Sequence, residues 1–252
     1  MTSSVLPQHL AFIMDGNNRW AKKRNLPASA GHRQGVTALR RTIKRCGELG
    51  IRIVTVFAFS NENWQRDKSE VDHLMKLFFE TLENSLTDFV KEGMILRVIG
   101  NRSKLDPNLV GLIESAEEAT QGGKYTLIVA LDYGGRQDIV AAAQKLATQV
   151  QQGAMTPADI TLESFNAHLA TAGLPPPDLC IRTSNEQRIS NFMLWQLAYT
   201  ELYFCPSLWP DFDSPQLEAA LADYANRQRR FGLRGQLKEA VRPNVSKVKN
   251  LA

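Results

Sequence analysis

Short apolar runs alternate along this chain with longer segments in which apolar residues recur every three or four positions. The runs predict six strands, which lie within residues 10–14, 51–60, 94–100, 125–135, 178–183 and 201–204. The recurring pattern predicts helices between them, at about 19–23, 31–48, 69–92, after Pro107, 136–150, 162–169 and after Ser214. Strands that alternate with helices favour an α/β fold, so we expect a mostly parallel six-stranded sheet covered by helices on both faces.

The segment 69–92 differs from the other predicted helices because apolar residues surround most of its circumference. Ser69 followed by Asp72 resembles a capping box, which predicts where this helix begins. An apolar face this broad is typical of a helix buried deep in the core. It is also typical of a helix that lines a hydrophobic ligand cavity, and the pattern alone leaves both explanations open.

Composition and charge narrow the class of protein. The chain has 252 residues, 43% of them hydrophobic, which suffices for one domain with a substantial core. We expect this domain to span residues 1–232 and a basic tail to span 233–252. From Gly232 onward there are five basic residues and one acidic residue, which accounts for the whole net charge of +4. Such a tail is most often solvated and can touch an anionic membrane surface, but its charge is too small to indicate a nucleic-acid partner.

The termini and cysteines indicate a compartment. No apolar run approaches the ~20 residues that a membrane span requires, and the first residues lack the basic and apolar regions of a signal peptide. Cys46, Cys180 and Cys205 are odd in number and lack a CxxC spacing, which argues against a disulfide framework or a structural zinc site. We therefore expect a cytoplasmic protein with reduced thiols.

Polar residues follow three of the predicted strands, at 15–20, 60–66 and 182–190. Because parallel strands end at one edge of their sheet, where such folds bind ligands, we expect the three clusters to meet. Arginines with hydroxyls and a few carboxylates suit phosphate groups and magnesium. With the broad apolar helix, they indicate a ligand with a phosphate head and an apolar tail. The plainer alternative is an ordinary turn in which Asp15 is the N-cap of the next helix.

Other common chemistries fit less well. The chain has no GxxxxGK[ST], no GxGxxG after a strand, no GxSxG and no HExxH. Its four histidines, at 9, 32, 73 and 168, are not paired like metal ligands. Asp211 and Asp213 form a DxD between two prolines, which predicts a turn with a helix cap.

Four motifs, in order along residues 7–232, resemble the signatures of the cis-prenyltransferase family, specifically the bacterial undecaprenyl diphosphate synthases. They read IMDGNNRWA (13–21), GHRQG (31–35), FSNENWQR (59–66) and IRTSNEQRISNFMLWQLAYTELYF (181–204). The resemblance implies a parallel sheet with a hydrophobic tunnel, and a homodimer. It also implies a Mg²⁺-dependent enzyme that adds isopentenyl diphosphate repeatedly, in cis, to farnesyl diphosphate. The expected product is undecaprenyl diphosphate, the precursor of a lipid carrier for peptidoglycan and other cell-wall polymers.

The same resemblance assigns residue roles. Asp15 matches a magnesium-binding aspartate that helps the allylic diphosphate leave, and Glu201 matches an acid that helps hold magnesium from across the dimer interface. Asn63 stands at the position usually assigned to proton removal. The loop around the allylic diphosphate would comprise Gly16, Asn17, Asn18, Arg19, Trp20 and His32. The second motif would contribute Ser60, Asn61, Glu62, Trp64 and Arg66, with Glu70 nearby. The isopentenyl diphosphate site would use Arg182, Arg188, Ile189 and Ser190.

The chain departs from the family pattern at several positions. Ser184 and Asn185 stand where two glycines are usual, so their side chains could crowd a diphosphate or resist a left-handed backbone. Ala28 replaces an arginine that often precedes the Gly-His pair, with Arg24 nearby, and Asn61 and Asp67 replace a serine and a proline. An amide is also a poor base, so Asn63 could position a water or leave the proton to the departing diphosphate.

Two other functions stay open. One is a synthase that stops at a shorter chain, which Phe78 and Phe79 would favour if they point into the tunnel. The other is a non-catalytic partner subunit, which the Ser184–Asn185 change supports and the retained Asp15 and Asn63 argue against. In the leading interpretation the enzyme contacts the inner face of the membrane through its product and its basic tail.

Overall fold

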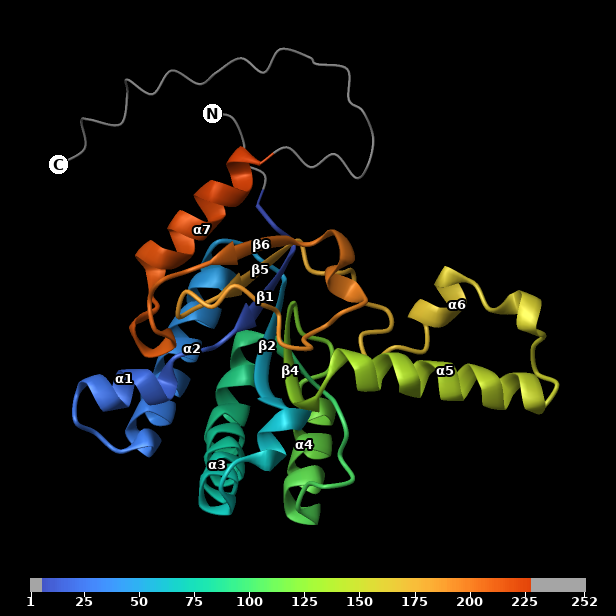
Figure 1. Cartoon of the computed structure of the whole chain (residues 1–252), viewed down its shortest axis with the longest axis horizontal. Helices are drawn as coiled ribbons and strands as arrows, with labels where there is room; N and C mark the ends of the chain where they lie inside the picture. Colours follow the sequence, from blue (N-terminus) through green and yellow to red (C-terminus); the bar gives the residue numbers. More distant parts are fainter. Residues whose placement is uncertain (1–5, 228–252) are drawn as a thin grey trace, which may run out of the picture.

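The computed structural model describes residues 6–227. Within them the six predicted strands form one sheet in which all neighbouring strands are parallel (Figure 1). In spatial order the strands are β3 (Met94–Ile99), β4 (Tyr125–Tyr133), β2 (Ile53–Ser60), β1 (His9–Ile13), β5 (Leu179–Arg182) and β6 (Glu201–Phe204). The expected parallel six-stranded sheet is confirmed. The predicted boundary at residue 232 and the tail at 233–252 lie outside the described residues.

The helices follow the predicted order. They are α1 (Asn17–Lys23), α2 (Ala28–Glu48), α3 (Lys68–Glu92), α4 (Pro107–Ala119), α5 (Gly135–Gln151), α6 (Leu162–Asn166) and α7 (Ser214–Asn226). Residues 6–227 also contain four 3₁₀ turns, at Asn61–Gln65, Pro157–Asp159, Gln196–Tyr199 and Trp209–Asp211. The DxD segment forms the last of these turns, and Asp213 is the N-cap of α7, as predicted. Within the described range, the model contains no helix long and apolar enough to cross a membrane.

The start of α3 differs from the prediction. The helix begins at Lys68 with Asp67 at its N-cap, so Ser69 lies inside the first turn and cannot form the predicted capping box. Two residues of a preferred N-cap type lie two positions apart here, and the chain uses the earlier one.

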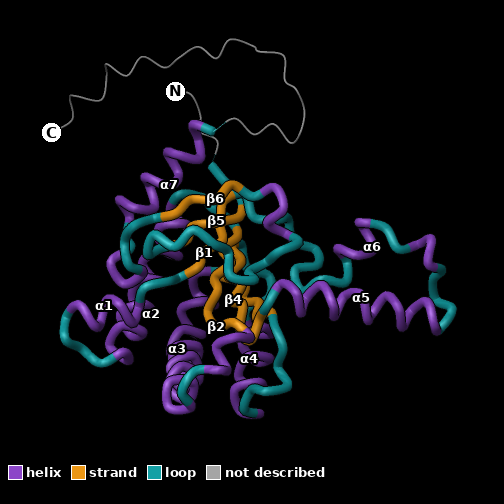
Figure 2. The backbone as a smooth tube through the Cα atoms, viewed as in Figure 1, coloured by secondary structure: helices purple, strands orange, loops and turns teal. Residues whose placement is uncertain are grey.

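The two faces of the sheet are covered unequally. Apolar residues of α2, α3, α4 and α7 join one large cluster with strand residues such as Leu10 and Phe12. The opposite face packs mainly against the segment 189–197, in which Phe192 and Met193 are fully buried. The trace in Figure 2 shows that most of α5, with α6, projects from the body as an arm. Helices therefore flank the sheet mostly on one face, and a non-helical segment covers much of the other.

The cysteines lie inside this core. Cys46, Cys180 and Cys205 are all free and buried. Burial raises the pKa of the Cys46 and Cys180 thiols to about 12, so both are neutral at physiological pH.

α1 packs closely on the first turns of α2 through a glycine. A Cβ added to Gly31 would lie 2.1 Å from the backbone oxygen of Asn17, so a larger residue would push α1 away. The GHRQG motif is therefore a packing surface, and the contact brings α1 and His32 to the same end of α2.

The centre of the sheet contains the point where the strand order reverses. The chain runs from β1 to β2 on one side and from β5 to β6 on the other, while β1 and β5 pair with each other. Open α/β sheets bind ligands beyond the carboxyl ends of such strands. Ile13 lies opposite Arg182 in this pair, so the residues that follow β1 meet the end of β5.

Candidate active site

Asp15 lies at this reversal point, and two arginines hold its carboxylate. Arg182 Nη2 donates to Asp15 Oδ2 at 2.9 Å, and Arg19 Nη2 lies 3.3 Å from Asp15 Oδ1. The hydroxyl of Thr183 donates to the Asp15 carbonyl at 2.7 Å and accepts from the Asp15 amide at 2.9 Å. The N-cap position of α1 belongs to Gly16, which has no side chain, so the alternative in which Asp15 caps this helix is wrong.

Gly16 is required by both conformation and space. Its φ of 112° lies in the region that favours glycine. A Cβ there would also lie 2.4 Å from Ser184 Oγ. The loop after β1 and the loop after β5 are therefore packed against each other at this residue.

Arg182 organises the loop that follows β5. Its side chain is only 5% exposed, and Nη1 donates to the Arg188 carbonyl at 2.6 Å and to Ser190 Oγ at 2.8 Å. One buried guanidinium thus fixes Asp15 on one side and Ser190 on the other. Its planar set of donors suits this role, since a lysine would offer no such fork.

Ser184 and Asn185 both adopt a left-handed backbone, the conformation that glycine tolerates best. Their φ values are 76° and 57°, both left-handed. The Ser184 amide donates to the Ser207 carbonyl at 2.8 Å, and the Asn185 amide donates to the Cys205 carbonyl at 2.9 Å. Ser184 and Asn185 were expected to resist a left-handed backbone. They adopt it nevertheless, so the loop carries backbone strain at these two residues. Neither residue lines the main cavity.

Glu186 lies between two cavity-lining arginines. Its Oε1 is 2.9 Å from Arg19 Nη2, and its Oε2 accepts from Arg188 Nη1 at 2.5 Å. The hydrogen bond from Arg188, with the positive charges of both arginines, holds the pKa of this carboxyl below its usual value. Arg19, Arg188 and Arg182 therefore alternate with the carboxylates of Asp15 and Glu186 in one network.

The second motif divides between the cavity and its surroundings. Ser60 and Asn63 line the cavity, and the Asn63 side-chain oxygen accepts from the Ser60 amide at 3.1 Å. Asn61 instead donates to Asp132, and Glu62 accepts from Asn191 at 2.9 Å. Trp64 packs edge-on against Phe59 with ring centroids 5.1 Å apart. The side-chain oxygen of Asn63, its only proton-accepting atom, is thus already hydrogen-bonded.

His32 lies on the wall of the cavity, where it is 8% exposed. Burial lowers the pKa of its imidazole; Arg66 and His73 act in the same direction, and Glu70 opposes them. Glu70 accepts from Arg66 at 3.0 Å and from Asn18 at 3.5 Å, which ties the start of α3 to α1. Glu70 thus supports this end of the cavity without lining it.

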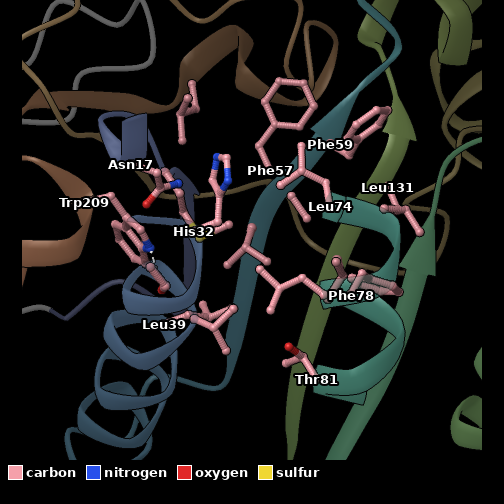
Figure 3. A pocket seen from close by; sticks show the side chains of 18 of the residues that line it. Asn17, His32, Leu39, Phe57, Phe59, Leu74, Phe78, Thr81, Leu131 and Trp209 are labelled. Carbon is pink, nitrogen blue, oxygen red and sulfur yellow. Dashed lines mark hydrogen bonds between the residues drawn. The ribbon is translucent and has the colours of Figure 1, made fainter. Parts of the chain in front are cut away.

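A cavity of about 660 Å³ opens from these residues between the sheet, α2 and α3. Figure 3 shows Asn17 and His32 at one end, with Leu39 of α2, Phe78 of α3 and Leu131 of β4 along the walls. Within α3 only Val71, Leu82 and Ser85 are fully buried. Of the two explanations for its broad apolar face, cavity lining is therefore confirmed. Phe78 lines this space and Phe79 does not.

The structure brings most of the predicted site residues to this cavity. Those that line it are Asp15, Gly16, Asn17, Asn18, Arg19, His32, Ser60, Asn63, Arg66, Arg182, Arg188 and Ser190. Those that do not are Trp20, Asn61, Glu62, Trp64, Glu70, Ile189 and Glu201.

Two of these outlying residues have well-defined partners elsewhere. Trp20 donates to Asp211 at 2.6 Å, and Arg24 stacks over its ring. Arg24, considered as a substitute for the arginine missing at Ala28, also pairs with Asp211 at 3.2 Å. Glu201 is the first residue of β6, where it pairs with Leu179 in register and accepts from Arg227 at 2.7 Å. It therefore lies at the end of β6 opposite to the Asp15 edge.

Thr183 and Trp209 were not predicted as residues of this site, and Glu186 was expected there only as one of several carboxylates, with no partner assigned to it. Thr183 fixes the Asp15 backbone, Glu186 joins two arginines, and Trp209 lines the cavity while donating to the Gly35 carbonyl at 2.9 Å. Thr183 and Glu186 lie within the fourth motif, so their proximity to Arg182 was the available signal. Trp209 had no local signal, because its role depends on contact with α2.

Comparison with known proteins agrees with this geometry. A family model described as "Putative undecaprenyl diphosphate synthase" matches residues 13–232. A ditrans,polycis-undecaprenyl-diphosphate synthase described as (2E,6E)-farnesyl-diphosphate specific, from Pseudomonas syringae pv. tomato, is 51% identical over 94% of this chain and 95% of its own length.

Two solved structures share the fold. Lavandulyl diphosphate synthase from Lavandula x intermedia, in complex with dimethylallyl diphosphate, is 42% identical with a TM-score of 0.87. A probable undecaprenyl diphosphate synthase from Campylobacter jejuni is 32% identical with a TM-score of 0.74. Each alignment covers 90% of this chain and 98% of the other. The resemblance in the motifs thus extends to the whole fold, and the chain belongs to the undecaprenyl diphosphate synthase family of cis-prenyltransferases.

Proposed function

We propose that this chain condenses isopentenyl diphosphate repeatedly, in cis, onto farnesyl diphosphate to give undecaprenyl diphosphate, the precursor of a lipid carrier for cell-wall polymers. The proposal rests on the way a charged environment and an apolar environment meet in one cavity. Three arginines and the Asp15 carboxylate form one end of a cavity whose walls are otherwise largely apolar. A diphosphate head and an isoprenoid tail need these two environments side by side.

The chemistry that this arrangement must support has three parts. The allylic carbon–oxygen bond breaks with both electrons leaving on the diphosphate, the double bond of isopentenyl diphosphate supplies the pair for the new carbon–carbon bond, and one proton is lost. Arg19, next to Asp15, is placed to stabilise charge on the departing diphosphate, whereas Arg182, which contacts Ser190, would bind isopentenyl diphosphate together with Arg188. The apolar walls retain the growing chain between additions.

Magnesium fits the donor set. The Asp15 carboxylate lines the cavity with 30% of its side chain exposed, and Mg²⁺ is commonly held by one or two carboxylates together with substrate phosphates and water. Residues 6–227 contain no group of three or more metal-binding side chains, so we propose that the ion binds with the diphosphate. When bound, Mg²⁺ would neutralise charge on the leaving group.

The side-chain amide of Asn63 is a poor candidate for the proton acceptor. An amide is a poor base, its oxygen already accepts one hydrogen bond from the Ser60 amide, and its nitrogen is only a donor. We propose that Asn63 orients substrate or water with that nitrogen, and that the departing diphosphate takes the proton. Gly16, Asn17, Asn18, His32 and Arg66 would surround the two diphosphates, since all of them line the same end of the cavity.

A homodimer would explain the position of Glu201. Within one chain Glu201 lies at the start of β6, whereas Asp15 follows the opposite end of the sheet. If both residues hold one magnesium ion, they must come from different copies. β6 is an edge strand of the sheet, and on its outer side the Leu202 carbonyl accepts from Arg227 at 3.0 Å, so a second copy would contact this strand together with Arg227. We also propose a cytoplasmic enzyme that meets the inner face of the membrane through its lipid product and its basic tail.

The test is incubation of the purified protein with farnesyl diphosphate, radiolabelled isopentenyl diphosphate and Mg²⁺, with products separated by chain length. A ladder that ends near eleven isoprene units, and that EDTA abolishes, is expected. A short ladder would replace undecaprenyl diphosphate with a shorter product, and no elongation at any isopentenyl diphosphate concentration would favour a non-catalytic partner subunit.

A further inference from the structure

Glu186 joins side chains from two distant segments. Arg19 belongs to α1 and Arg188 to the loop after β5, yet each guanidinium meets one oxygen of the same carboxylate, at 2.9 and 2.5 Å. Both arginines line the cavity, whereas Glu186 does not. Glu186 thus contacts the binding site only through the arginines.

The carboxylate is more firmly placed than the arginines it contacts. Its side chain is 26% exposed, against 46% for Arg19 and 59% for Arg188. The two residues before it are anchored by hydrogen bonds to the segment after β6, and their left-handed φ values leave that turn little freedom. A fixed carboxylate therefore restrains two long, flexible side chains.

This restraint leaves donors free for substrate. A guanidinium has five N–H groups. Arg188 uses one terminal nitrogen on Glu186, while Arg19 uses Nη2 on Glu186 and Asp15 and one N–H of Nη1 on the Ser184 carbonyl at 3.4 Å, which leaves its Nε and the second N–H of Nη1. Each arginine can therefore bind Glu186 and a phosphate oxygen together. Holding the arginines in place before substrate arrives lowers the conformational entropy lost on binding.

We propose that Glu186 is a positioning residue that couples the two diphosphate sites, by holding Arg19 for the allylic diphosphate and Arg188 for isopentenyl diphosphate. The proposal rests on the function proposed above. It differs from a competing role, in which Glu186 would occupy the arginines and have to leave before a diphosphate binds.

The test is Glu186→Gln, which keeps the shape of the side chain and removes its charge. KM for farnesyl diphosphate and KM for isopentenyl diphosphate should both rise, each by about tenfold, because one residue restrains both arginines. Glu186→Asp keeps the charge on a shorter side chain, and should restore part of the loss for one substrate or both. The matched control is Glu218→Gln, which breaks an arginine–glutamate pair of 2.6 Å with Arg45 outside the cavity and should leave both KM values unchanged.

Several results would overturn the proposal. A fall in either KM would mean that Glu186 competes with substrate, and a rise in only one would mean that the two sites are not coupled. A lower melting temperature with unchanged KM values would assign the residue a purely structural role. These results all require an active wild-type protein, so they are distinct from failure of the proposed function. Titration calorimetry with inorganic diphosphate adds a readout without turnover, in which Glu186→Gln should bind more weakly than wild type.

Discussion

His9 is the most deeply buried histidine of the described chain, with an exposure of 0% at the start of β1. Its Nδ1 lies 2.8 Å from the Pro175 carbonyl, which can only accept, so Nδ1 carries the proton and Nε2 accepts from the Thr55 hydroxyl at 2.7 Å. Burial lowers the pKa of this imidazole from 6.5 to about 4.

The low pKa of His9 predicts acid sensitivity. Between about pH 6.5 and 4 the unfolded chain takes up a proton at this position while the folded chain does not. The free energy of unfolding should therefore fall as the pH falls. The contribution of His9 to this fall is about 3 kcal/mol once the pH is below both pKa values, that of the unfolded and that of the folded chain. Urea unfolding of wild type and His9→Gln at several pH values checks this. The free energy of unfolding of the variant should depend less steeply on pH than that of wild type. Equal pH dependence of the two proteins would mean that carboxylates alone cause the acid sensitivity.

Ser184 combines two unfavourable features that a glycine would remove. Its φ of 76° is strained for a residue with a side chain, and its buried hydroxyl has no hydrogen-bond partner within residues 6–227. Ser184→Gly should raise the free energy of unfolding by about 1 kcal/mol, since relief of strain exceeds the greater freedom of glycine in the unfolded chain.

Ser184→Ala separates these two causes, because it removes the hydroxyl and keeps the strain. In thermal unfolding the order of stability should be glycine, then alanine, then wild type. An alanine variant more stable than the glycine variant would show that the backbone is not strained at this position.

The helix α3 both lines the cavity and packs against the core, and two adjacent phenylalanines differ in whether they reach the cavity. Both phenylalanines pack against the core, but Phe78 also lines the cavity and Phe79 does not. Phe78→Ala should lengthen the isoprenoid product by about one isoprene unit, because the freed volume of the cavity admits more of the growing chain. Phe79→Ala should lower stability without changing product length. If both variants gave the wild-type product, this part of α3 would not limit chain length.

At the scale of the whole molecule, the order of elements was predictable because each strand and helix carries a local pattern. The order of strands in space was not, since it depends on contacts between segments far apart in sequence. The pairing of β1 with β5 is the example that matters most, because it brings Arg182 to Asp15. The site residues came from motifs, whereas the position of Glu186 between Arg19 and Arg188 depends on how two loops converge.

The homodimer proposal predicts complementation between two inactive variants. Asp15→Ala and Glu201→Gln each remove one of the two proposed magnesium ligands, so each alone should be inactive. If every site takes these residues from different copies, a mixed dimer has one intact site. Equal mixing after reversible dissociation should recover about a quarter of wild-type activity, since half of the dimers are mixed and each has one of two sites. Absence of any recovery would mean that Glu201 does not act across an interface.

The proposed function requires that Asp15, held by Arg19 and Arg182, makes this cavity a site for diphosphate departure. The most direct measurement compares elongation of farnesyl diphosphate by wild type, Asp15→Asn and Asp106→Asn. Asp106 caps α4 through the Asn108 amide outside the cavity, a role that asparagine also fills. Asp15→Asn should reduce the elongation rate by at least about a hundredfold, while Asp106→Asn should retain the wild-type rate. A ladder of normal length and rate from Asp15→Asn would contradict this requirement.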